Sequence, residues 1–167
     1  MSKTIYVVRH AKSSWADMTL SDKERPLNQR GHRDAPIMAR WCLQQGHVPD
    51  VLISSTAVRA ATTADYFATG LGLDTAKITS YDDLYHAPAH LYIETCYGLS
   101  DEVDSVMMFG HNPGITYLAN EVASKYIDNV PTCGVLVIDY HGDNWQDLDV
   151  SKCNLRTLYT PKTLGNV

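Results

Sequence analysis

Arg9 and His10 end a β-branched and aromatic run, residues 5–8, that is typical of a buried strand. A buried strand gains little from packing a guanidinium or an imidazole, so both side chains are candidates for chemistry. A guanidinium binds phosphate or carboxylate oxygens in pairs, and a neutral imidazole can act as a nucleophile. Because ligands of open α/β sheets collect at the carboxyl ends of the strands, other strand ends should supply partners.

Two further predicted strands also end in polar side chains. Strand 51–55 leads into a helix that carries Arg59 in its first turn, and strand 105–109 is followed by His111. A positive side chain at a helix start costs up to ~1 kcal/mol against the helix dipole, unless an anion binds there. Right-handed crossovers in a mostly parallel sheet bring such strand ends to one edge. The sequence therefore predicts one oxyanion pocket with two arginines and two histidines.

The two histidines favour catalysis of phosphoryl transfer over binding alone. We predict that His10 attacks phosphorus through a neutral ring nitrogen. Arg9, Arg59 and His111 are predicted to stabilise the oxygens of the in-line transition state. Ser13, in the short polar segment after His10, is a further candidate contact for the substrate phosphate. This chemistry needs no metal, and we expect neither a metal nor another cofactor.

The pair His86 and His90 is the pattern in the chain that most resembles a metal site. The two residues are four apart, but Pro88 lies between them, and neither a third ligand nor a paired carboxylate accompanies them. We therefore do not predict a metal site there.

Composition and charge narrow the class of protein. The chain has 167 residues, 44% of them hydrophobic, which is enough for one core, and we predict a single domain over residues 1–167. A net charge of -5 argues against general affinity for nucleic acid or anionic membranes. There is no apolar run of the ~20 residues that span a bilayer, and the first residues do not resemble a signal peptide. Four scattered cysteines without a CxxC pair are typical of a reducing compartment, so we expect a soluble, cytoplasmic protein.

Helix and strand patterns alternate along the chain, which predicts an α/β fold. Helical spacing of apolar residues covers 32–45, 57–70, 89–99 and a stretch after residue 114. Strand patterns cover 5–10, 51–55, 105–109 and 133–140, with at most a short edge strand in 78–84. Residues 145–149 are predicted as the hairpin partner of strand 133–140, or as an edge. Residues 17–30, rich in charge, are predicted as a long loop.

Four segments resemble signature blocks of the histidine phosphatase superfamily. Residues 7–11 (VVRHA) are similar to its RHG signature, and residues 54–64 (SSTAVRAATTA) to its SSP-x-x-RA-x-x-TA block. Residues 110–112 (GHN) resemble its second-histidine block, and residues 25–31 (RPLNQRG) lie where the family order places them. The short length and the segment 152–155 are most similar to the phosphohistidine phosphatase SixA branch.

This resemblance implies a phosphoglycerate mutase-like fold, in which a three-layer α/β/α sandwich surrounds a mostly parallel mixed sheet. It also implies that His10 becomes phosphorylated and that Arg9, Arg59 and His111 complete the phosphate pocket. The activity that it implies is hydrolysis of a phosphoryl group, with protein phosphohistidine as the preferred substrate class. A phosphorylated protein, such as a histidine phosphotransfer domain, is then the expected partner.

The proton donor is the part of the site that the resemblance specifies least. Residues 81–85 only loosely resemble the acid-bearing segment of the family, and Asp83, with Asp82 beside it, is the candidate general acid. A protonated phosphoramidate leaves with less help from an acid than an alkoxide does, so a weak acid position suits phosphohistidine. Ala16 stands where the mutase branch has a phosphate-contacting asparagine, which disfavours a mutase.

Two alternatives stay open at this point. The same site could serve a small-molecule phosphomonoesterase, or it could belong to a phosphate-binding regulatory module without turnover. A pure binding module has no need of a nucleophile, which disfavours the second alternative. Residues 71–88, between the second and third predicted helices, are too few for a lid domain, so we predict an open pocket mouth that admits a protein-borne phosphate.

Overall fold

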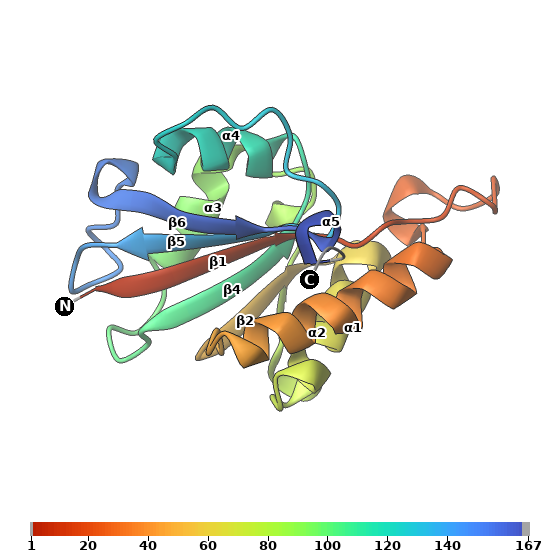
Figure 1. The fold of residues 1–167 in the computed structure, drawn as a ribbon, viewed down its shortest axis with the longest axis horizontal. Coiled ribbons are helices and arrows are strands. Elements are labelled where there is room, and N and C mark those ends of the chain that lie inside the picture. The colour runs from red at the N-terminus through yellow and green to blue at the C-terminus, as the bar shows by residue number, and fades with distance from the viewer. Residues whose placement is uncertain (1, 165–167) are drawn as a thin grey trace.

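One mixed sheet forms the centre of the computed structural model, which describes residues 2–164 (Figure 1). Its strand order is β3-β2-β4-β1-β5-β6. The first four strands in this order run parallel, and β5 runs antiparallel to both of its neighbours. The strands are Lys3–Arg9 (β1), Val51–Ser55 (β2), Thr79–Tyr81 (β3), Ser105–Gly110 (β4), Val135–Tyr140 (β5) and Cys153–Tyr159 (β6).

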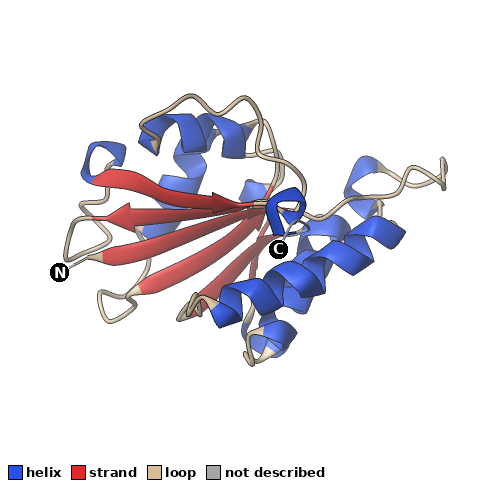
Figure 2. Cartoon of the chain, viewed as in Figure 1, coloured by secondary structure: helices blue, strands red, loops and turns tan. Residues whose placement is uncertain are grey.

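Helices cover both faces of this sheet, as Figure 2 shows in blue against the red strands. One face packs on α1 and α2 through a core that includes Met38, Phe67 and Phe109. The other face packs on α3 and α4 through a core that includes Tyr92 and Leu118. The predicted three-layer α/β/α sandwich is therefore confirmed. The helices are Gln29–Gln44 (α1), Val58–Gly70 (α2), Ala89–Cys96 (α3), Gly114–Val122 (α4) and Pro161–Leu164 (α5).

The strand register brings three carboxyl ends together. Arg9, the last residue of β1, pairs with Gly110 of β4, and Phe109 of β4 pairs with Ser54 of β2. Both faces of these strands are covered by helices, which explains why their sequences are almost continuously apolar up to these ends. The polar residues that follow the three strands therefore share one edge of the sheet, as predicted.

Helix α1 begins earlier than its apolar spacing predicts. The side chain of Asn28 accepts a hydrogen bond from the backbone N–H of Gly31 at 2.9 Å and so caps the helix start. The predicted loop 17–30 also contains a short 3-10 helix, Asp22–Glu24, which lies beside α2. This loop, coloured red to orange, projects from the body of the molecule before the chain returns to α1 (Figure 1).

The predicted hairpin partner of β5 is wrong. Residues 145–149 contain no strand, and the antiparallel partner of β5 is β6 instead. Trp145 and Leu148 are both buried in the core, and the indole N–H of Trp145 donates to the carbonyl of Val103 at 2.9 Å. The connection between the two strands thus uses its apolar residues to close the core, which an alternating strand could not do.

Two features of the structure bear on the class of protein. None of the helices in residues 2–164 is long and apolar enough to cross a bilayer. All four cysteines, which lie within this range, are free thiols.

Candidate active site

His10 follows β1 directly and lies at the centre of the polar edge of the sheet. Its backbone N–H donates to the carbonyl of Gly110 at 3.0 Å, which extends the pairing of β1 and β4 by one residue. Its ring Nδ1 lies 2.7 Å from the carbonyl oxygen of Ala11. A carbonyl can only accept, so Nδ1 carries the proton and Nε2 is left with a free lone pair. His10 is thus held in the tautomer that a nucleophile needs.

The environment of His10 also keeps its imidazole neutral. Burial lowers the pKa of His10 to about 4, and the charges of Arg59, Arg9 and Arg25 act in the same direction. The hydrogen bond to the Ala11 carbonyl opposes this shift. The side chain is only 7% exposed, so one end of the ring faces the pocket while the rest is enclosed.

His111 follows β4 and lies beside His10, with their ring centroids 5.3 Å apart. Its Nε2 is 2.8 Å from the hydroxyl oxygen of Ser55, which also accepts from the backbone N–H of Ala57 at 3.2 Å. The Ser55 hydroxyl can therefore donate its proton to Nε2, and in that arrangement the proton of His111 is on Nδ1. Burial, with His10 and Arg59 close by, lowers the pKa of His111 to about 3.

The backbone of His111 is fixed by a buried tyrosine of α3. The Tyr92 hydroxyl accepts from the backbone N–H of His111 at 3.1 Å. A Cβ at Gly110 would lie 2.1 Å from this hydroxyl, so only glycine leaves room for Tyr92 to reach the site. This explains why β4 ends in a glycine directly before His111.

Arg9 and Arg59 supply guanidinium groups from two elements, as predicted. Arg9 donates from Nη1 to the carbonyl of Val130 at 3.0 Å. Arg59, in the first turn of α2, is 3% exposed. Among the described residues, Arg9 Nε and His111 Nδ1 are two of the three buried side-chain polar atoms without a hydrogen-bond partner. Because buried polar groups are normally bonded, these two atoms are suited to contact an oxyanion.

Asp22 is a central residue of the site that the sequence did not single out. Its Oδ2 accepts from Arg59 Nη2 at 2.9 Å, and its Oδ1 accepts from Arg25 Nη1 at 2.9 Å. The Tyr85 hydroxyl donates to the same carboxylate, and His86 Nε2 lies 3.3 Å from Oδ2. The bond from Tyr85, with those from Arg59 and Arg25, holds the pKa of Asp22 well below its usual range. Asp22 thus stays ionised at the pocket.

The charges of this group match a phosphoryl dianion. Arg9, Arg25 and Arg59 bring three positive charges, and Asp22 brings one negative charge, so two positive charges are left over among these four described residues. Arg9 and Arg59 are near enough for the charge of Arg59 to lower the pKa of Arg9, after the larger effect of burial. A bound anion would relieve this repulsion.

The remaining predicted residues lie at the rim or outside the hydrogen-bond network. Ser13 is buried, and its hydroxyl is bonded to Arg25, whose guanidinium also stacks on Trp15 at 3.4 Å. Asp83 is exposed in the 3-10 helix Asp82–Leu84, and its carboxylate makes no hydrogen bond or ion pair within residues 2–164. Its role as general acid stays a prediction.

His86 and His90, the sequence pattern most like a metal site, do not lie in a cluster of ligands. Within residues 2–164 there is no group of three or more His, Cys, Asp or Glu side chains placed to hold a metal ion. His86 instead contacts the edge of the site, where it pairs with Asp22. His90 lies exposed on α3.

Comparison with known proteins shows which family the chain resembles. The family model of the histidine phosphatase superfamily (branch 1) matches residues 5–85. A solved structure assigned as the phosphohistidine phosphatase SixA of Agrobacterium tumefaciens is 30% identical, with a TM-score of 0.78 over 95% of this chain and 98% of that chain. The chain belongs to the histidine phosphatase superfamily.

Two further matches extend over nearly the whole chain. The structure of the protein histidine phosphatase SixA complexed with tungstate superposes with a TM-score of 0.80 over 96% of this chain and 99% of that chain, at 22% identity. A protein of Mycobacterium tuberculosis is 29% identical over 165 residues, which cover 93% of this chain and all of the relative. The expected phosphoglycerate mutase-like fold of this superfamily is therefore confirmed.

The depressed pKa values of the two site histidines predict a loss of stability in mild acid. An unfolded histidine binds a proton near pH 6.5, whereas His10 binds one only near pH 4 and His111 only near pH 3. The unfolded state therefore binds more protons in this window, and the free energy of unfolding falls as the pH decreases below about 6.5. Each histidine contributes a slope of up to about 1.4 kcal/mol per pH unit.

Urea unfolding at pH 7, 6 and 5 measures this slope. The double variant His10→Asn/His111→Asn should lose most of it, because the asparagine amides do not titrate. An unfolding free energy that changes equally with pH in wild type and double variant would contradict the neutral state of the two rings.

Proposed function

We propose that this protein is a metal-independent phosphatase that transfers a phosphoryl group to His10 and then hydrolyses phospho-His10. The observation that carries the proposal is the hydrogen bond from His10 Nδ1 to the Ala11 carbonyl, which leaves Nε2 as a free nucleophile inside a cationic pocket. His111 Nδ1 and the guanidinium groups of Arg9 and Arg59 would bind the phosphoryl oxygens. The domain would span residues 1–167 and act in the cytoplasm.

The roles in the reaction follow from charge and geometry. His10 Nε2 forms a bond to phosphorus as the bond to the leaving group breaks, and water then displaces His10 and releases inorganic phosphate. The excess of two positive charges stabilises the equatorial oxygens in both steps, so the guanidinium groups supply the charge that other phosphatases obtain from metal ions. Ser13 acts through Arg25, to which it is bonded.

We propose protein phosphohistidine as the preferred substrate class. The similarity to SixA structures supports this choice. The pocket mouth supports it further, because the segment between α2 and α3 holds only the short strand β3 and two 3-10 helices. The exposed side chains of Trp15 and Met18 lie on the loop that projects beside the site (Figure 1). Such a rim is suited to contact a folded phosphoprotein.

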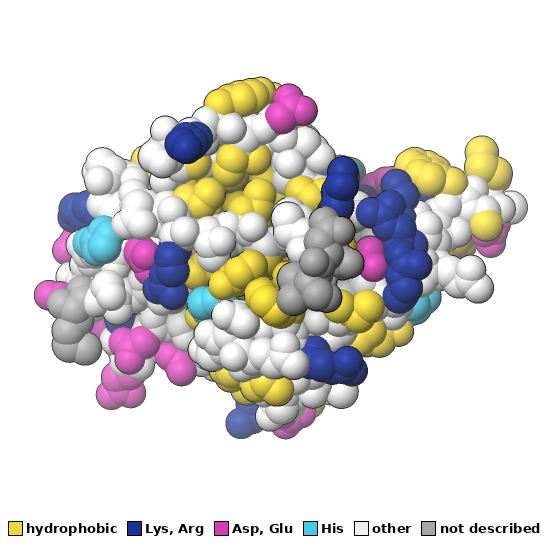
Figure 3. All heavy atoms as spheres, viewed as in Figure 1, with side chains coloured by type: hydrophobic (Ala, Val, Ile, Leu, Met, Phe, Trp, Pro, Cys, Tyr) yellow, Lys and Arg dark blue, Asp and Glu magenta, His cyan; other side chains and the backbone are white. Residues whose placement is uncertain are grey.

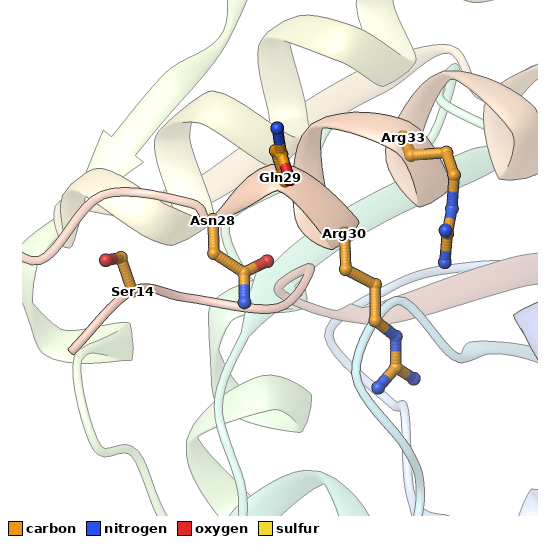
Figure 4. Close-up of a pocket in the computed structure, with 5 residues that line it drawn as sticks. All are labelled: Ser14, Asn28, Gln29, Arg30 and Arg33. Atoms are coloured by element: carbon orange, nitrogen blue, oxygen red, sulfur yellow. The ribbon is translucent and has the colours of Figure 1, made fainter. Parts of the chain in front are cut away.

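A basic hollow next to the site adds a contact surface for such a partner. Figure 4 shows that Arg30 and Arg33 extend in the same direction from the first turns of α1. They line a hollow of about 760 Å³ together with Ser14, Asn28 and Gln29. Figure 3 shows Lys and Arg side chains gathered in a stripe beside the projecting loop. The hollow would accept acidic side chains around a phosphorylated histidine.

The substrate class is tested by comparing kcat/KM on a phosphorylated histidine phosphotransfer domain with kcat/KM on small sugar phosphates. We expect the phosphoprotein to be preferred. A strong preference for sugar phosphates would instead favour the small-molecule phosphomonoesterase. Phosphate binding without any turnover would favour the regulatory module.

The double variant Arg30→Ala/Arg33→Ala should weaken turnover of the phosphoprotein alone. Each exposed charge contributes up to about 1 kcal/mol to a complementary partner, so kcat/KM on the phosphoprotein should fall by up to about 30-fold. Turnover of p-nitrophenyl phosphate should not change, because neither arginine contacts His10. The matched control is Lys77→Ala, which removes an exposed cation beyond the far end of α2. An equal loss on both substrates would contradict a role in partner binding.

A further inference from the structure

His86 stands at the outer end of a row of three imidazoles. His10 and His111 are 5.3 Å apart, and His111 and His86 are 5.6 Å apart, measured between ring centroids. The first two rings are buried, whereas the His86 side chain is 56% exposed. In an in-line reaction at His10 the leaving group departs on the side away from the nucleophile, toward the solvent. Of the three rings, His86 is thus the one that is open to the solvent, toward which a leaving group must depart.

Contacts on three sides hold the His86 ring at this position. Its Nε2 lies 3.3 Å from Asp22 Oδ2, and its ring lies against Tyr85 with centroids 4.0 Å apart. Its backbone has a φ of 56°, which a residue other than glycine adopts at a cost of about 1 kcal/mol. The ring is therefore placed by the site and is not a loosely held surface side chain.

The other groups at the mouth are poor proton donors near neutral pH. The bonds that Asp22 accepts hold its pKa well below the usual range, so its carboxylate has no proton to give. Burial, with the bond to Asp22, raises the pKa of the Tyr85 phenol, which makes it a weaker acid. His10 and His111 are kept neutral by burial. Histidine is the side chain that most often transfers protons in enzyme catalysis, and His86 is in contact with the Asp22 carboxylate.

We propose that His86 is the general acid and base of the reaction, with Asp22 as the residue that positions it. This inference rests on the proposed function. In the first step the imidazolium of His86 gives its proton to the leaving atom, which is the imidazole nitrogen of a phosphohistidine or the oxygen of a phosphate ester. The bond from phosphorus to that atom breaks as the bond to His10 Nε2 forms. In the second step neutral His86 takes a proton from water, the water oxygen bonds to phosphorus, and the electron pair of the broken P–N bond returns to His10.

Aryl phosphates with different leaving groups test this proposal. Loss of a general acid slows expulsion of a basic leaving group far more than expulsion of an acidic one. The variant His86→Gln keeps an amide that can bond to Asp22 but cannot transfer a proton. Its kcat/KM on phenyl phosphate should fall about 100-fold, whereas its kcat/KM on p-nitrophenyl phosphate should fall less than about fivefold. The matched control His90→Gln, on α3, should leave both values unchanged.

The outcomes separate this proposal from the proposed function. If wild-type protein shows no turnover that depends on His10, either of the two esters or of a phosphorylated histidine phosphotransfer domain, the proposed function itself fails. If wild-type protein turns over both esters and His86→Gln lowers the two rates equally, or not at all, His86 is not the general acid. If Asp83→Asn gives the selective loss on phenyl phosphate and His86→Gln does not, the role belongs to Asp83.

Discussion

The variant His10→Ala is expected to lose turnover of every phosphorylated substrate by about 10⁴-fold or more, because it removes the proposed nucleophile. The Ala11 carbonyl fixes the proton of His10 on Nδ1, which leaves Nε2 free for the proposed attack on phosphorus. Burial keeps the ring neutral, with a pKa near 4, so nearly all of the protein holds the reactive form at neutral pH.

His10→Ala should still bind phosphate, which distinguishes a lost nucleophile from a collapsed pocket. Hydrogen bonds to residues other than His10 hold Arg9, Arg59 and His111. Their positions therefore do not depend on the His10 ring. Inorganic phosphate should therefore raise the thermal unfolding temperature of the variant as it does for wild type. Turnover by His10→Ala within tenfold of wild type would rule out the proposed nucleophile. His90→Ala provides the matched histidine control.

The variant Arg59→Ala is expected to lower kcat/KM by about 10²- to 10³-fold, the usual effect of removing one preorganised donor to a transition-state oxyanion. Arg59 is almost fully buried in the first turn of α2, where a positive charge without an anion opposes the helix dipole. Arg59→Lys should lose nearly as much, because an ammonium cannot reproduce the paired contacts of a guanidinium. Arg40→Ala, on the exposed side of α1, serves as the matched control.

The negative charge of Asp22 should affect phosphate binding once Arg59 is removed. Without Arg59, the carboxylate of Asp22 keeps its partners Arg25 and Tyr85 but faces the phosphate with less charge to balance it. The double variant Arg59→Ala/Asp22→Asn should therefore bind phosphate more tightly than Arg59→Ala alone. If the additional change weakens phosphate binding instead, Asp22 contributes to the pocket in a way that charge balance does not describe.

The sequence was most informative where a residue type does not suit the helix or strand in which it lies. Arg9 and His10 do not suit a buried strand, and Arg59 does not suit a helix start, so each residue indicated a site without any knowledge of its partners. Their convergence followed from the parallel sheet, because the register places Arg9 beside Gly110 and Phe109 beside Ser54. These positions are fixed by backbone pairing, which a sequence pattern predicts well.

Asp22 and His86 could not be found in this way. Both lie in irregular segments, where exposed polar residues are the ordinary case and give no contrast. The position of Asp22 depends on Arg25 and on a bridge between Ser13 and Leu27, which folds the long loop back toward β1. A Cβ at Gly31 would lie 2.2 Å from the Lys12 carbonyl, so this glycine lets the loop pack on α1. The segment of residues 25–31 that resembled the family was the one available signal.

The error at residues 145–149 has a related cause. The prediction rested on the turn residues 141–144 after a strand, although Trp145 and Leu148 are three apart and do not follow the two-residue alternation of a strand. Only the packed structure shows that both fill the core beneath the connection from β5 to β6.

Trapping of the phosphorylated enzyme tests most directly whether His10 is the nucleophile. Wild-type protein is mixed with a radiolabelled phosphoryl donor, the reaction is quenched in base, and the labelled residue is identified by peptide mapping. We expect a label that is stable in base and labile in acid, located on His10, present in His90→Gln and absent from His10→Ala. Turnover by wild-type protein with no label on His10, or with the label on another residue, would contradict this expectation.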